Sequence, residues 1–92
     1  MAVVRHLPER KRDVQLREQG DRSVLVKPSG GTYALNPTAR AIWELCDGTT
    51  TIDELAEALS QVFAIDEATA TRDVAVTIEQ LEAADLVTAT NR

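Results

Sequence analysis

Tyr33–Leu59 reads YALNPTARAIWELCDGTTTIDELAEAL, and this stretch predicts how the chain folds. Its first residues alternate as in a strand, and helical spacing follows at once. Asn36 is a good helix N-cap, and Pro37 suits the first helical position, where no N–H is needed. Asp47-Gly48 has the chemistry of a helix end. The stretch therefore predicts a short helix directly behind a strand.

Two more helices are predicted downstream. Thr51 and Glu54 have the spacing of a capping box, in which each side chain accepts a hydrogen bond from the other residue's backbone N–H. Asp66 is placed to cap a third helix over about residues 67–84. All three helices carry an apolar stripe. The stripe residues are Ala39, Ile42, Trp43 and Cys46, then Ile52, Leu55, Ala56, Leu59, Val62 and Phe63, then Val74, Ile78 and Leu81.

Three short strands are predicted before the first helix, over residues 13–18, 22–27 and 32–35. The segments between them, 19–21 and 28–31, have turn chemistry, so the strands read as an antiparallel meander. The element order predicts an α+β domain that is winged helix-turn-helix-like, with a three-stranded antiparallel sheet followed by three helices.

The domain is expected to span residues 13–90, after a flexible N-terminal tail over residues 1–12 that lacks periodicity and ends in a short basic run. Residues 86–89, LVTA, are either a terminal strand or an extended tail. The few aromatic residues are expected in or near the core; they are Tyr33, Trp43 and Phe63.

No catalytic or metal site is apparent in the sequence. The sole cysteine, Cys46, falls on an apolar stripe and reads as a buried, inert thiol, while the sole histidine, His6, lies in the polar tail. Gly30-Gly31 fits a hairpin turn better than a phosphate-binding loop. We therefore expect a protein that is not an enzyme and has no cofactor and no metal. No apolar run is long enough to span a membrane and no signal peptide is visible, so a cytoplasmic location is expected.

The charge is unevenly distributed along the chain. Residues 1–40 carry eight Lys/Arg and four Asp/Glu, which gives a net charge of +4. Residues 41–92 carry two Lys/Arg and eleven Asp/Glu, which gives a net charge of −9. A winged-helix DNA-binding regulator is the alternative use of such a fold. Its third helix would need cations to neutralise phosphates, but this helix offers only Arg72 against four acidic residues. We therefore expect no nucleic-acid partner.

After catalysis and DNA binding, the function class that remains is the binding of a peptide. A small sheet has edge strands, whose free backbone groups can pair with an incoming extended segment, or with a second copy in a homodimer. Beside its core stripe, the third helix presents a second face. This face consists of Asp73, Val76, Thr77, Gln80 and Ala84. Val76 is either a lone exposed valine or the apolar wall of a groove beside the edge strand.

The opening stretch, followed by DVAVTIEQLEAADLV from Asp73, resembles the PqqD-like family, also called RiPP recognition elements. The resemblance covers roughly residues 14–87. The matching positions are Leu35, Asn36, Thr38, Ala39, Ile42, Trp43, Leu45, Cys46, Asp47, Gly48, Thr51, Ile52, Glu54, Leu55, Asp73, Val74, Ile78, Leu81, Leu86 and Val87.

The resemblance implies a non-catalytic domain that binds the leader segment of a ribosomally made precursor peptide. The leader adds to the third strand of the sheet and packs against the third helix. The domain then presents it to a modifying enzyme, either a radical SAM enzyme or a leader peptidase that works with a cyclase. The peptide-binding positions carried over are Gly31, Thr32, Tyr33, Ala34, Leu35, Asp73, Val76, Thr77, Gln80 and Ala84. Thr77 stands where family members often have a bulky apolar residue, so the groove wall is expected to be more polar here.

Overall fold

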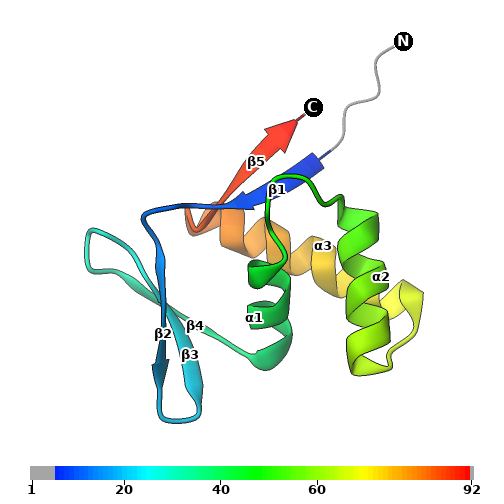
Figure 1. Cartoon of the computed structure of the whole chain (residues 1–92), viewed down its shortest axis with the longest axis horizontal. Helices are drawn as coiled ribbons and strands as arrows, with labels where there is room; N and C mark the ends of the chain where they lie inside the picture. The colour runs from blue at the N-terminus through cyan, green and yellow to red at the C-terminus, as the bar shows by residue number, and fades with distance from the viewer. Residues whose placement is uncertain (1–5, 92) are drawn as a thin grey trace.

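A computed structural model describes residues 6–91 of the 92-residue chain. Its architecture is α+β, as predicted, with three helices and two separate sheets (Figure 1). The elements are β1 (His6–Arg10), β2 (Gln15–Gln19), β3 (Arg22–Val26), β4 (Thr32–Leu35), α1 (Pro37–Glu44), α2 (Ile52–Phe63), α3 (Glu67–Ala83) and β5 (Val87–Asn91).

The predicted antiparallel meander is confirmed, with the strand order β2-β3-β4. Its first turn pairs Gln19 with Arg22 around Gly20, whose φ of 66° is a conformation that glycine adopts without strain. The second turn places Gly30 at a φ of 95°. Both loops therefore have the chemistry that closes a hairpin.

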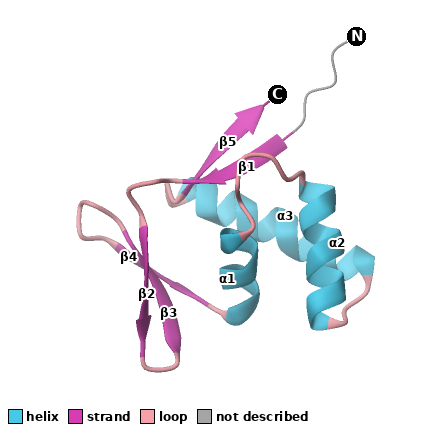
Figure 2. Cartoon of the chain, in the orientation of Figure 1, coloured by secondary structure: helices cyan, strands magenta, loops and turns pink. Residues whose placement is uncertain are grey.

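The first described residues form a strand rather than a flexible tail. β1 runs antiparallel to β5, with Leu7 opposite Thr90 and Arg10 opposite Val87. Together they make a two-stranded ribbon apart from the β2–β4 sheet (Figure 2). The prediction of a mobile tail is thus wrong for residues 6–10; the remainder of that tail before residue 6 lies outside the described residues. The segment read as a strand or an extended tail is a strand from Val87 onward.

The helix starts are those that the sequence predicts. Asn36 caps α1 by accepting a hydrogen bond from the Ala39 N–H at 2.7 Å. Thr51 and Glu54 form both bonds of the capping box at α2. Asp66 caps α3 through the Thr69 N–H at 2.7 Å, and this bond lowers the pKa of its carboxyl.

α1 ends before the Asp47-Gly48 pair that was predicted to stop it. The helix stops at Glu44, and the N–H of Leu45 bonds back to the carbonyls of Ala41 and Ile42. Gly48, with φ of 81°, instead donates its N–H to the carbonyl of Pro8 in β1 at 3.0 Å. The Asp47-Gly48 turn therefore joins the helices to the ribbon.

One core lies between the helices and the inner face of the β2–β4 sheet. Its fully buried members include Leu25, Ile42, Leu55, Leu59, Ile78 and Leu81. Trp43 is buried and Tyr33 packs against the core, as predicted. Two stripe residues depart from the prediction, since Val62 is 71% exposed and Phe63 37% exposed. Both lie in the last turn of α2.

Arg40 fastens α1 to the sheet. Its guanidinium bonds to Glu44 one turn along the helix at 2.7 Å, to Ser23 of β3 at 3.1 Å, and to Glu18 of β2. The bonds to Glu44 and Glu18 raise the pKa of Arg40. These contacts fix the start of α1, and with it the end of β4.

Candidate functional site

β4 is an edge strand, because among residues 6–91 the order β2-β3-β4 leaves one of its sides unpaired. The N–H of Lys27 donates to the carbonyl of Gly31 at 2.8 Å, so these two residues form a hydrogen-bonded pair. Bonded and non-bonded pairs alternate along an antiparallel ladder. Tyr33 and Leu35 therefore bond inward to β3, whereas Thr32 and Ala34 direct their backbone groups toward the free edge.

The side chains of β4 hold this edge in place. Leu35 is buried and Tyr33 is half-buried against the core, while Thr32 and Ala34 are exposed on the other face. The strand is thus anchored from within, and its outward backbone groups are held in one position.

Next to the end of β4 lies a hollow of about 290 Å³, which we call the α1–α3 groove. It is lined by Asn36 and Thr38 at the start of α1 and by Arg72, Asp73, Val76 and Thr77 on α3. Val76 is 49% exposed, and Thr77 and Asp73 are half-buried. Val76 is therefore an apolar wall residue in an otherwise polar groove, and not a lone valine on an open surface.

The structure brings together part of the predicted set. Asp73, Val76 and Thr77 meet in the α1–α3 groove. Gln80 lies further along α3 and Ala84 is the C-cap of this helix, and neither lines the groove. Gln80 is exposed, and Ala84 is half-buried against the core.

Three groove residues were not among the sequence-predicted positions: Asn36, Thr38 and Arg72. The sequence marks Asn36 as a helix cap, which it is, and as a position of the family resemblance, but not as a residue of the site. Arg72 neighbours Asp73 along α3, but no periodic pattern marks it. Their proximity to the α3 face depends on how α1 meets α3, and that is a tertiary contact without a local sequence pattern.

The chemistry of the groove suits contacts with a peptide. One guanidinium and one carboxylate flank the valine, so the groove offers hydrogen bonds and a small apolar surface. Within residues 6–91 no group of three potential metal ligands is found. No helix of this part of the chain has the length and apolar character to cross a bilayer.

Cys46 is buried, as predicted, although it lies in the turn after α1 and not on the helix itself. It is fully buried, and its Sγ donates to the carbonyl of Ile42 at 3.1 Å. Burial raises the pKa of this thiol from 9.0 to about 12. The thiolate that a nucleophile requires is therefore disfavoured.

Comparison with family models gives one match that covers most of the chain. The family model described as coenzyme PQQ synthesis protein D (PqqD) matches residues 22–87. A search of curated proteins finds no match.

Solved structures share the fold. The solution NMR structure of the PqqD truncation of Methylobacterium extorquens PqqCD, a functional and stand-alone RiPP recognition element, is 28% identical, with a TM-score of 0.74 over 88% of this chain and 87% of that one. TbiB1 in complex with the TbiA(beta) leader peptide is 21% identical (TM-score 0.72; 86% and 93% covered). A lasso peptide synthetase B1 complexed with the leader peptide is 19% identical (TM-score 0.75; 89% and 98% covered).

The last two likenesses, at such low identity, establish the fold alone. The family model spans most of the chain and includes the edge strand, all three helices and the α1–α3 groove. The chain therefore belongs to the PqqD family.

Proposed function

We propose that this protein is a RiPP recognition element that binds the leader segment of a ribosomally synthesised precursor peptide and presents it to a modifying enzyme. The observation that carries the proposal is the free edge of β4 next to the α1–α3 groove. Two structural neighbours are complexes with leader peptides, which supports the same use of this fold.

In the proposed complex the leader extends the β2–β4 sheet by one strand. Thr32 and Ala34 supply the outward N–H and C=O groups, and Gly31, Tyr33 and Leu35 complete the docking strand. Alternate side chains of the leader face α3, where Val76 offers the apolar contact. The leader orders only on binding, so part of the interaction free energy is spent on ordering and release stays easy.

The site residues that we propose on α3 are Asp73, Val76, Thr77, Gln80 and Ala84, with the last two contacting a leader longer than the groove. The domain itself performs no chemistry and needs no cofactor. The partner is a radical SAM enzyme, or a leader peptidase with its cyclase, and the complex forms in the cytoplasm. Without a leader, the same β4 edge is available for a homodimer.

The alternative of a DNA-binding regulator is not favoured by any feature of the described surface. The exposed face of α3 carries Glu67 and Glu79 against Arg72, so its charge opposes that of a duplex.

The test is titration calorimetry with a synthetic leader peptide from the precursor encoded beside this protein's gene. Val76→Asp places a carboxylate in the α1–α3 groove and is expected to weaken binding roughly tenfold or more. Val62→Asp is the matched control, because Val62 is more exposed and lies on α2 outside the groove. A wild-type chain that binds no such leader, or equal losses in both variants, contradicts the proposal.

A further inference from the structure

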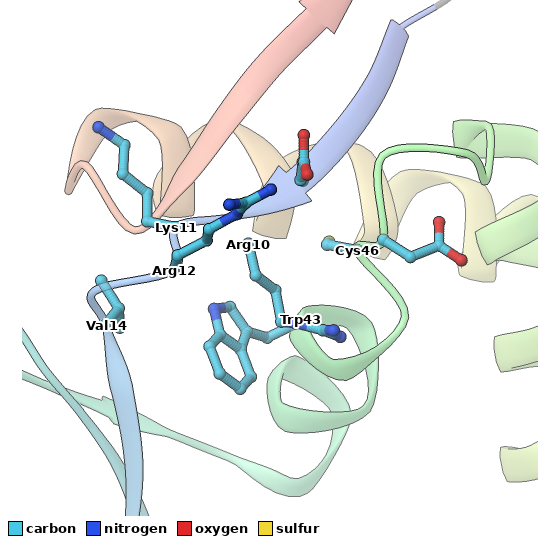
Figure 3. Close-up of a pocket in the computed structure, with 8 residues that line it drawn as sticks. Arg10, Lys11, Arg12, Val14, Trp43 and Cys46 are labelled. Atoms are coloured by element: carbon cyan, nitrogen blue, oxygen red, sulfur yellow. The ribbon is translucent and has the colours of Figure 1, made fainter.

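A second pocket lies at the opposite end of α1 from the α1–α3 groove. This pocket, the Trp43 pocket, has a volume of about 350 Å³ and lies between the β1–β2 connection and the C-terminal end of α1 (Figure 3). Its lining residues are Glu9, Arg10, Lys11, Arg12, Val14, Trp43, Cys46 and Asp47. None of them lines the α1–α3 groove, so the two sites can be occupied together.

The indole N–H of Trp43 has no acceptor among the described residues. The side chain is 7% exposed and its Nε1 is shielded from solvent. An indole N–H can only donate, and buried donors in native proteins are nearly always paired. In Figure 3 the nitrogen lies on the edge of the ring that is turned toward Arg12 and Val14. The wall of the pocket therefore contains a buried donor that has no acceptor among the described residues.

Arg12 supplies the charge that such a ligand would meet. It is exposed and forms no ion pair with a residue that the structure describes, whereas Lys11 is paired with Asp85 at 2.6 Å. Arg10 also has partners within the protein. Its guanidinium lies 5.6 Å from the Trp43 ring centroid and donates a hydrogen bond to the carbonyl of Glu44.

The two acidic residues of the Trp43 pocket are directed at the neighbouring turn. The Asp47 carboxylate accepts from the N–H groups of Thr49 and Thr50 at 2.9 and 3.0 Å. The Glu9 side chain lies against Gly48, about 3 Å from where a Cβ of that residue would be. Neither carboxylate neutralises Arg12, so the open side of the pocket favours an anion.

We propose that the Trp43 pocket binds a carboxylate side chain from an acidic segment of a partner protein, held by the Arg12 guanidinium and the Trp43 indole N–H. The Arg12 side chain is exposed and lies on the side of the pocket toward which the indole nitrogen is turned, so it can close over the bound carboxylate. A protein segment suits the site better than a free metabolite. The pocket offers few hydrogen-bond donors beside the apolar Val14, whereas a metabolite site usually encloses its ligand with more polar groups. This face stays accessible while the groove holds a leader, as docking of a second protein requires.

The test uses the indole resonance, which is unique because Trp43 is the only tryptophan. The full chain is titrated with the capped peptide acetyl-Gly-Glu-Leu-Glu-Gly-amide and followed by ¹⁵N–¹H NMR. We expect a saturable downfield shift of the indole proton and no shift with the peptide in which both glutamates are glutamines. Arg12→Gln is expected to weaken binding roughly tenfold.

Arg17→Gln is the matched control, since Arg17 is an exposed cation on β2 outside the pocket. Trp43→Phe keeps an aromatic ring but removes the N–H. Peptide binding to this variant is followed through the Val14 amide, after circular dichroism confirms that the variant folds.

The proposal is overturned by an indole proton that does not shift, by an equal response to the glutamine peptide, or by an equal loss of binding in the Arg12 and Arg17 variants. An equal response to free glutarate overturns the assignment to a protein segment. No leader is present in this experiment, so its failure leaves the proposed function of the groove intact.

Discussion

Cys46 shows how the surroundings of one residue decide its chemistry. Its thiol is fully buried beneath α1, and burial raises its pKa to about 12. The sequence predicted this inert state from the position of Cys46 on an apolar stripe. The same reasoning placed Val76 beside the stripe of α3 but left open whether it lay in a groove, because that depends on what packs next to α3.

The raised pKa makes stability depend on alkaline pH. The unfolded thiol loses its proton near the ordinary value of 9.0, whereas the folded thiol keeps it until about 12. Between these values the unfolded state binds fewer protons, so the stabilisation that is complete below pH 9 is lost as pH rises toward 12. We expect the free energy of unfolding, measured with urea, to fall with rising pH in this window.

Cys46→Ala is the control for that experiment, because it removes the thiol and leaves every other side chain of the protein in place. The variant is less stable overall, since it leaves a cavity, but its stability should fall less steeply above pH 9. Equal slopes in the two proteins would show that the thiol is not held neutral by the fold.

At the scale of elements, the caps and turns were readable because each depends on residues close in sequence. Asn36, Thr51 and Asp66 begin their helices as predicted. The end of α1 was misplaced because Gly48 has a second role, bonding to β1 far away in the chain. The exposure of Val62 was missed for a similar reason, since helical periodicity does not report how far along a helix the tertiary packing extends.

The capping box at α2 gives a prediction at this scale. Thr51→Ala removes the acceptor for the Glu54 N–H, which lies 3.2 Å from the threonine oxygen. The loss is expected to cost about 1 kcal/mol of unfolding free energy in urea denaturation. Thr71→Ala makes the same chemical change at an exposed position within α3 and is expected to be neutral or slightly stabilising. Equal destabilisation by both changes would contradict the role of the cap.

The orientation of β4 gives a second prediction. Ala34→Pro removes an N–H that faces the free edge, and edge strands tolerate proline there. This variant is expected to stay folded by circular dichroism and yet lose leader binding in calorimetry. Tyr33→Pro removes an inward N–H and is expected to be less stable than Tyr33→Ala, which loses only the side chain. A fully binding Ala34→Pro would show that the leader does not add to this edge.

At the scale of the whole molecule, the first and the last described strands pair with each other. β1 and β5 pair across nearly the full length of the sequence, and Figure 1 shows them together above the helices. No local pattern predicts such a pairing, and the N-terminal segment contains Pro8, which argues against a strand. Pro8 is accommodated because its carbonyl accepts from Gly48 and its missing N–H costs no bond to β5.

This closure distinguishes the fold from the flexible tail that the sequence suggested. Leu7 in β1 is 8% exposed, so Leu7→Ala should lower the unfolding free energy by about 2 kcal/mol, whereas the same change in a mobile tail would cost nothing. Val62→Ala is the control, because it truncates a 71% exposed side chain and is expected to shift stability by less than about 0.5 kcal/mol. Urea denaturation at neutral pH measures both. β1 bonds to the turn after α1 through Pro8 and Arg10, and α1 in turn fixes the end of β4. The Leu7→Ala change should therefore also weaken leader binding modestly, although it alters no residue of the α1–α3 groove. An unchanged stability of Leu7→Ala would mean that β1 does not pack on the core in solution.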